Sequence, residues 1–191
     1  LIAHPQEKTL TEVLNALKSK LKHENIYVRG RSAVAIGEII SSIDKIKLRK
    51  KPIKGLLNYL KKEGGVARIS VAQSLGEIGE KIPPTLQTDI VGQLLIHLDA
   101  DDDYVRTAVA WALGRMGTIL SDSLIRQITP KLKARLDDRD IKVKARVAIA
   151  LTRLRIDVTP AEKEKLLSDL LEFLKSSTVY NKSTSLGPPL V

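Results

Sequence analysis

A block of about 19 residues recurs four times in this sequence, and that recurrence limits the fold more than any other feature. The copies align without a gap at offsets of 39, 38 and 38 residues. They are Leu21–Ile39, Leu60–Ile78, Leu98–Met116 and Leu136–Leu154. A period of this length is typical of solenoids, in which one small unit is stacked along an axis.

Two aligned positions in the block hold only small residues in most copies. The first position is alanine in every copy, at Ala33, Ala72, Ala110 and Ala148. The second holds Gly37, Gly76 and Gly114, with Thr152 in the last copy. A glycine inside a helix costs about 1 kcal/mol relative to alanine, so three recurrences indicate close contact with a neighbouring helix.

Apolar residues at three-and-four spacing predict two helices in each unit. The expected first helices are Thr11–Lys22, Lys51–Lys62, Thr88–Leu98 and Ser121–Leu136. The expected second helices are Val28–Ser42, Val66–Lys81, Asp103–Ile119 and Ile141–Arg155. Pro130 is expected to kink the fourth first helix or to delay its start. A last amphipathic segment, Pro160–Lys175, is expected to begin a fifth unit and to cap the stack.

The predicted class is therefore all-α, a right-handed α-α superhelix of about four and a half helix pairs. The solenoid is predicted over residues 1–175. Its units lie at about 9–44, 48–82, 86–119 and 121–156, with a half unit at 159–175. Residues 176–191 are rich in Ser and Thr and contain Gly-Pro-Pro, so we expect them to form a flexible tail.

The start of each second helix carries a family resemblance. A basic residue recurs there, at Arg29, Arg68, Arg106 and Lys144, and is followed by Ala-Ile-Gly, Ser-Leu-Gly or Ala-Leu-Gly in the first three copies. This pattern resembles the HEAT repeat family, in its HEAT-like or phycobilin-lyase-type variant. The resemblance implies that each basic residue forms an acid–base ladder between adjacent repeats. The matching acids are Glu24, Glu63, Asp101, Asp102 and Asp140.

Composition and motifs favour a binding protein over an enzyme. The sequence has no Cys, which excludes disulfides, a thiol nucleophile and a Cys-based zinc site. Its one His-Glu pair, His23-Glu24, cannot assemble the paired-iron site of the HEAT-like hydroxylases. The aspartates at 99 and 101–103 lack the spacing of a calcium loop and are expected to cap a helix. No cofactor, metal or catalytic residue is predicted, and only a lyase-type or DNA-glycosylase-like activity is left open.

Other features bear on location and extent. The lack of cysteine favours an intracellular, cytoplasmic protein. No apolar run approaches ~18 residues, so no membrane span is expected. The sequence begins with Leu1 and not with Met, which suggests a piece of a longer chain.

Second helices usually line the concave face of such a solenoid, so their exposed positions are candidates for partner binding. These positions are Arg31, Glu38, Gln73, Glu77, Trp111, Arg115, Arg146 and Arg153. One column among them changes from Glu to Arg along the stack. Trp111 is the only Trp, and Trp with a nearby Arg is typical of an interface anchor. The alternative for Trp111 is half-burial between repeats.

The formal net charge is +10, and much of the excess lies in one run. The run comprises Lys45, Lys47, Arg49, Lys50, Lys51 and Lys54. It indicates either a patch for an anionic partner or a solvated linker between helices. The predicted function is a scaffold that binds a protein or peptide on its concave face. Nucleic-acid binding is the alternative, and a phycobilin lyase-related role is a further one.

Overall fold

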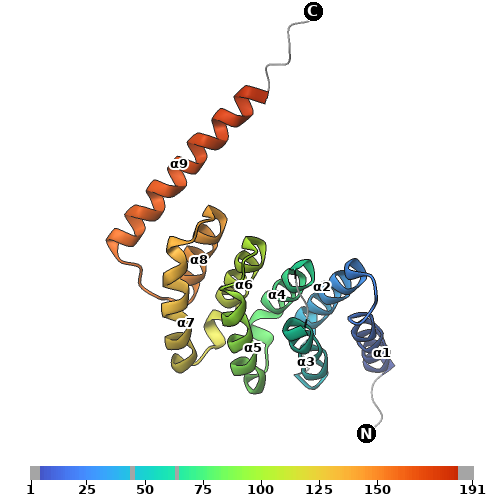
Figure 1. The fold of residues 1–191 in the computed structure, drawn as a ribbon. Coiled ribbons are helices and arrows are strands. Elements are labelled where there is room, and N and C mark those ends of the chain that lie inside the picture. The colour runs from blue at the N-terminus through green and yellow to red at the C-terminus, as the bar shows by residue number, and fades with distance from the viewer. Residues whose placement is uncertain (1–4, 44–45, 63–64, 185–191) are drawn as a thin grey trace, which may run out of the picture.

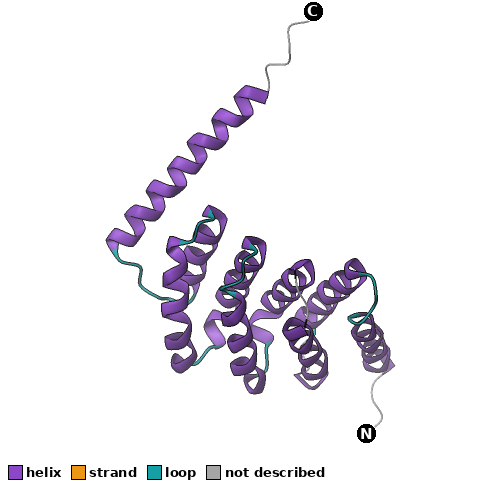
Figure 2. Ribbon diagram, in the orientation of Figure 1, coloured by secondary structure: helices purple, strands orange, loops and turns teal. Residues whose placement is uncertain are grey.

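The computed structural model describes residues 5–43, 46–62 and 65–184, and these contain α-helices, three single 3₁₀ turns and no strand (Figures 1 and 2). Four helix pairs form the stack. They are α1 (Pro5–Lys20) with α2 (Ile26–Ser42), α3 (Ile46–Lys62) with α4 (Gly65–Ile78), α5 (Pro84–His97) with α6 (Asp103–Met116), and α7 (Asp122–Ala134) with α8 (Ile141–Arg153). A last helix, α9, spans Pro160–Thr184. The predicted all-α superhelix of helix pairs is confirmed.

Side-chain caps fix where the second helices begin. Asn25 Oδ1 accepts a hydrogen bond from the backbone N–H of Tyr27, at 2.8 Å. Asp102 and Asp140 cap α6 and α8 in the same way. Such caps satisfy N–H groups that the first helical turn leaves without partners. The expected role of the acidic turn as a helix cap is thus confirmed for Asp102.

Consecutive second helices touch through the glycine column. A Cβ atom added at Gly37, Gly76 or Gly114 would lie 2.9 Å from Ser74 Cα, 3.1 Å from Ala112 Cα and 2.8 Å from Ala150 Cα, respectively. The distances at Gly37 and Gly114 are too short for a real side chain, and the one at Gly76 is tighter than most real Cβ contacts, so the steric reason predicted for the glycines is confirmed.

The two layers of helices differ in how tightly they pack. Consecutive second helices make many more contacts with one another than consecutive first helices do. Figure 1 shows α2, α4, α6 and α8 following one another in one row, with α3, α5 and α7 in a second. A stack whose two layers differ in spacing bends toward the closer layer. The second helices therefore lie on the inner face, as the sequence predicted.

Helix α9 is packed against the stack only in part. Three aligned leucines lie at the ends of the first helices of units two to four and are buried. They are Leu60, Leu98 and Leu136, which are 0, 0 and 6 % exposed. The equivalent Leu174 is 59 % exposed, because no second helix follows α9 within the described residues. Ion pairs from Lys144 to Asp169 and from Lys133 to Glu162 hold the first half of α9 against the last unit. In Figure 1, α9 then runs away from the stack.

Some predicted boundaries differ from the observed ones. Helix α9 continues to Thr184, so the tail predicted from residue 176 begins as helix. Residues 185–191 lie outside the described residues. Helix α3 begins at Ile46 despite Pro52 inside it, and α7 begins at Asp122, so Pro130 does not delay its start. None of the described helices is both long and apolar enough to cross a bilayer.

The same substitution at two glycines should have opposite effects. Gly92 lies inside α5 with open space around its Cα, so Gly92→Ala should raise the free energy of unfolding by up to about 1 kcal/mol. Gly114→Ala should lower it by about 1–3 kcal/mol, because the added Cβ meets the backbone of Ala150. Urea unfolding followed by circular dichroism measures both changes. Equal stabilisation by the two variants would show that α6 and α8 are not in contact at Gly114.

Candidate functional site

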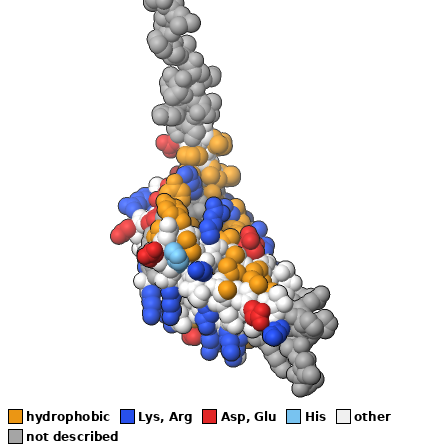
Figure 3. Space-filling model, turned by 90° about the vertical axis from the view of Figure 1, so that its right-hand side faces the viewer, with side chains coloured by type: hydrophobic (Ala, Val, Ile, Leu, Met, Phe, Trp, Pro, Cys, Tyr) orange, Lys and Arg blue, Asp and Glu red, His pale blue; other side chains and the backbone are white. Residues whose placement is uncertain are grey.

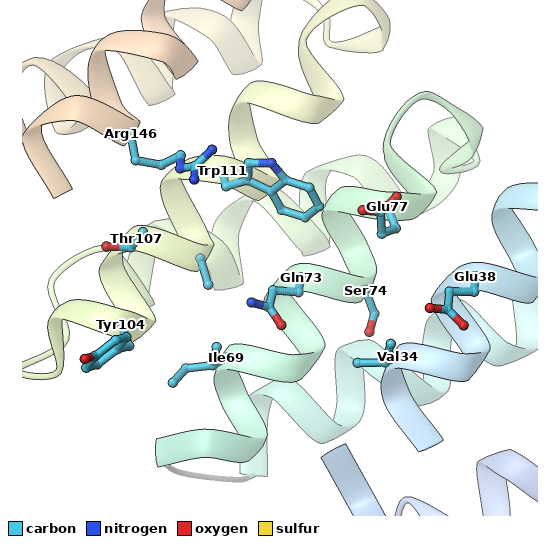
Figure 4. Close-up of a pocket in the computed structure, with 11 residues that line it drawn as sticks. Val34, Glu38, Ile69, Gln73, Ser74, Glu77, Tyr104, Thr107, Trp111 and Arg146 are labelled. Carbon is cyan, nitrogen blue, oxygen red and sulfur yellow. The ribbon is translucent and has the colours of Figure 1, made fainter. Parts of the chain in front are cut away.

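The second helices form the inner face of the stack, and their exposed surface on this face is hollowed into a groove, called here the inner groove. Its volume is about 570 Å³, and Figure 4 shows the side chains around it. The lining residues are Val34, Glu38, Ile69, Gln73, Ser74, Glu77, Tyr104, Thr107, Ala108, Trp111 and Arg146. Five of the eight positions predicted for partner binding are therefore brought together: Glu38, Gln73, Glu77, Trp111 and Arg146.

Trp111 lies at the centre of the inner groove and rests on the glycine column. Its ring atom Cζ3 is 2.2 Å from the place where a Cβ on Gly76 would stand. The missing side chain of Gly76 is therefore what gives the indole its seat. Trp111 is half-buried between repeats and also lines the groove, so its predicted half-burial is confirmed, whereas its role as an interface anchor stays a prediction. In Figure 4, Arg146 and Glu77 lie on opposite sides of the indole.

The charges predicted along the inner face are exposed. Glu38 and Glu77 are both exposed, and the ion pairs found among the described residues involve neither of them. Arg115 and Arg153 line an adjoining hollow of about 260 Å³, and Arg115 Nε donates to the carbonyl of Gly76 at 3.4 Å. Arg31 is exposed on α2 and is not among the residues lining either hollow.

Two of the recurring basic residues at the second-helix starts, Arg106 and Arg29, bind groups within the stack. Arg106 donates to the carbonyls of Ala100 and Asp101 in its own turn, at 2.7 and 2.8 Å. Its other nitrogens form a two-bond ion pair with Asp138 in the next unit, at 2.9 and 2.8 Å. Both side chains are almost fully buried, with 3 and 1 % exposed.

Arg29 lies two units earlier in the stack, on α2, and makes equivalent contacts. It donates to the carbonyls of His23 and Glu24, both at 2.9 Å, and to the hydroxyl of Tyr59 in the next unit, at 2.9 Å. The acid–base ladder implied by the resemblance is therefore corrected in detail. Backbone carbonyls of the turn accept these bonds, and the acceptor in the following repeat is Asp138 or Tyr59. Glu63 lies outside the described residues.

Two buried groups, His97 and Asp138, have shifted pKa values. Burial, followed by the charge of Arg68, lowers the pKa of His97, although the hydrogen bond between its Nε2 and the Leu60 carbonyl opposes the shift. Burial alone would raise the pKa of Asp138. Hydrogen bonds from Arg106 and from the Asp140 N–H, with the charges of Arg106 and Arg135, outweigh burial and lower it.

The other chemistry-bearing side chains are tied into local structure. Asp99 binds Lys131 at 3.0 Å and also Arg135, and hydrogen bonds from these two partners lower the pKa of Asp99. His23 Nδ1 accepts the N–H of Asn25 at 3.1 Å. Within the described ranges, no three His, Asp or Glu side chains gather as a metal site would require.

The basic run at residues 45–54 proves to be helical. It lies on α3, so its interpretation as a linker is wrong for the described residues. Lys50, Lys51 and Lys54 are exposed, whereas Arg49 is buried with Nη1 3.5 Å from the carbonyl of Lys81. Arg49 therefore packs within the stack and is not available to a partner. Lys45 lies outside the described residues, and so does the side chain of Lys47.

Comparisons with known proteins place the chain in the same structural class. The family model of Cnd1, the non-SMC mitotic condensation complex subunit 1, matches residues 104–179, about two fifths of the chain. The search of curated proteins gave no match.

Solved structures share the fold at low sequence identity. An engineered protein superposes with a TM-score of 0.61 at 20 % identity, over 82 % of this chain and 67 % of its own. A designed armadillo repeat protein in complex with the peptide (KR)4 superposes with a TM-score of 0.60 at 15 % identity, over 78 % of this chain and 65 % of its own. A second engineered protein superposes with a TM-score of 0.57 at 22 % identity, over 76 % of this chain and 38 % of its own. This chain therefore spans about two thirds or less of the length of each of these three proteins. Fold and repeat pattern together define a HEAT-like helical repeat protein.

Removing the buried guanidinium should be costly. Arg106→Met leaves the carboxylate of Asp138 buried and without two of its hydrogen bonds, so the free energy of unfolding should fall by about 3–5 kcal/mol. Lys131→Met breaks an exposed ion pair and should cost no more than about 1 kcal/mol. Urea unfolding compares the two. If the double variant Arg106→Met, Asp138→Leu is no more stable than Arg106→Met alone, the stranded carboxylate is not the cause.

His97 should make stability depend on pH. Its pKa is lowered in the folded chain, so unfolding takes up a proton below the ordinary pKa of about 6.5. The contribution is therefore complete above pH ~6.5 and is lost as the pH falls toward the lowered folded value. Urea unfolding of the wild type should weaken over that interval more than that of His97→Gln. Parallel curves for the two proteins would contradict the prediction.

Proposed function

We propose that this chain is a non-enzymatic, intracellular scaffold that holds a segment of another protein in the inner groove. The carrying observation is the groove itself, with the half-buried Trp111 at its centre. Aromatic side chains in partly desolvated hollows supply much of the binding energy at protein interfaces. Exposed Glu38 and Glu77 without ion pairs would give such a partner its orientation.

The charges around the groove suggest the chemistry of the partner segment. Glu38 and Glu77 lie on α2 and α4, whereas Arg146 lies on α8, at the far end of the hollow. A bound segment would therefore carry Lys or Arg at one end and a carboxylate at the other. The designed armadillo repeat protein with the same fold holds (KR)4, a basic peptide, which agrees with the acidic end of this groove.

The same acids argue against a nucleic acid in the inner groove. Two exposed carboxylates within one hollow repel phosphates, and the lining offers only one cationic side chain, that of Arg146. The alternative of nucleic-acid binding therefore finds no support on this face.

Substitution of Trp111 in the inner groove, together with Arg115 in the neighbouring hollow of about 260 Å³, should abolish partner capture. We expect Trp111→Ala with Arg115→Glu to retain its helix content, because neither side chain is fully buried. The control is Ile96→Ala with Arg126→Glu, which changes one exposed apolar residue and one exposed Arg on α5 and α7. Affinity purification from the source cell should recover a protein with the wild type and the control that the groove variant fails to hold.

The captured protein then permits a direct measurement. Trp111 is the only Trp, so its fluorescence should change when the partner segment fills the groove. The groove variant lacks this fluorophore, so its affinity is compared with that of the control by isothermal titration calorimetry. Its dissociation constant should be at least about tenfold higher, an energy of about 1.4 kcal/mol. Equal affinity of the groove variant and the control would place the binding surface elsewhere.

A further inference from the structure

Helix α3 carries an unusual concentration of positive charge. Its 17 residues include seven Lys or Arg and no Asp or Glu, whereas the equivalent helix α5 has no Lys or Arg. At 3.6 residues per turn, its five described lysines fall within an arc of about 120°. They are Lys50, Lys51, Lys54, Lys61 and Lys62, all of them exposed. We call this surface the lysine face.

A hollow between α1 and α3 borders the lysine face. Its volume is about 640 Å³, and it is called here the α1–α3 hollow. Its lining residues are Lys18, Leu21, Lys22, Arg29, Gly55, Asn58, Tyr59 and Lys62. Lysines thus stand on both walls, and no acidic side chain is among the described lining residues. Gly55 allows the stem of Lys18 to lie against α3, where its Cγ would be 3.4 Å from an added Cβ.

Among the described residues, no ion pair involves the lysines of these two surfaces. Ion pairs found among the described residues all involve other cations, on α6 to α9. Like charges within one helix face repel one another and destabilise the helix. A polyanion that lies along the face would remove this repulsion. Figure 3, which views the α1 end of the stack, shows Lys and Arg side chains gathered along its lower edge.

We propose that the lysine face and the α1–α3 hollow bind the phosphate backbone of duplex DNA. From Lys50 to Lys62 the face extends for roughly 18 Å, a length over which duplex DNA carries on the order of ten charges. Tyr59, the one aromatic residue of the hollow, is buried and accepts a hydrogen bond from Arg29. Without an exposed ring for stacking, a single strand gains nothing over a duplex.

The shape of the site separates DNA from a membrane surface. A bilayer is flat, whereas the lysines of the α1–α3 hollow stand on both sides of a depression. A ridge of phosphates fits a depression of this kind. The site is also distinct from the inner groove, because α1 and α3 belong to the first-helix layer. One molecule can therefore hold a protein segment and a duplex together.

A salt series tests the proposal. A labelled duplex of about 20 base pairs is titrated with the full chain by fluorescence anisotropy between ~50 and ~200 mM salt. The test variant is Lys51→Gln, Lys54→Gln, Lys62→Gln. The matched control is Arg126→Gln, Lys163→Gln, Lys175→Gln, which removes the same charge from exposed positions on α7 and α9.

The wild type should bind with a steep salt dependence. In the test variant, the magnitude of the slope of log K against log salt should fall by about 2–3, since each phosphate contact contributes roughly 0.9 to it. Its affinity at ~50 mM salt should fall at least about tenfold, whereas the control keeps the wild-type slope. The variant Trp111→Ala, Arg115→Glu should lose little DNA affinity, because it alters the other layer.

Three results would overturn the proposal. The wild type could fail to bind the duplex at the lowest salt. The control could weaken binding as much as the test variant, which would mean that net charge alone attracts DNA. Finally, a poly-glutamate peptide, or vesicles of phosphatidylcholine and phosphatidylserine in equal amounts, could bind more tightly than the duplex at the same salt. Tighter binding of poly-glutamate would assign the face to an acidic protein segment, and tighter binding of the vesicles would assign it to a membrane.

Discussion

Backbone-to-backbone approach between successive second helices determines the shape of this protein. At Gly114 the next helix stands so close that even a methyl group would lie 2.8 Å from the Cα of Ala150. Because the first helices have no such contact, one layer is more tightly spaced than the other and the stack curves. Curvature places the inner groove on the second helices and spreads the first helices toward solvent. The seat of Trp111 on Gly76 arises from the same small-residue column.

Buried hydrogen bonds fix the register between units. Arg106 joins two carbonyls of its own turn to Asp138 of the following unit, so a shift of one unit against the next would strand a charge. Such an arrangement adds specificity more than net stability, because desolvating the ion pair offsets much of its attraction. Tyr59 replaces the carboxylate as the acceptor for Arg29. The position can therefore change its chemistry as long as an acceptor remains.

Periodicity alone was enough to predict the fold, since each unit contributes the same columns and errors cancel over four copies. It placed the start of α3 at Lys51, whereas the helix begins at Ile46 and continues through Pro52, because packing of Ile53 and Leu56 outweighs one lost helical bond. For the inner groove, alignment pointed to five of the residues that line it, namely Glu38, Gln73, Glu77, Trp111 and Arg146. It missed Lys18, Lys22 and Lys62, which lie on different helices and meet only through the packing of α1 on α3.

The last unit breaks the small-residue column, since Thr152 stands where three glycines precede it. Its side chain is exposed on α8, and its hydroxyl donates back to the carbonyl of Ala148 at 3.0 Å. A helix laid against α8 at this position would have to stand farther off than α8 stands from α6. The close backbone approach that Gly37, Gly76 and Gly114 allow to the following helix is therefore not open to α8 at this position.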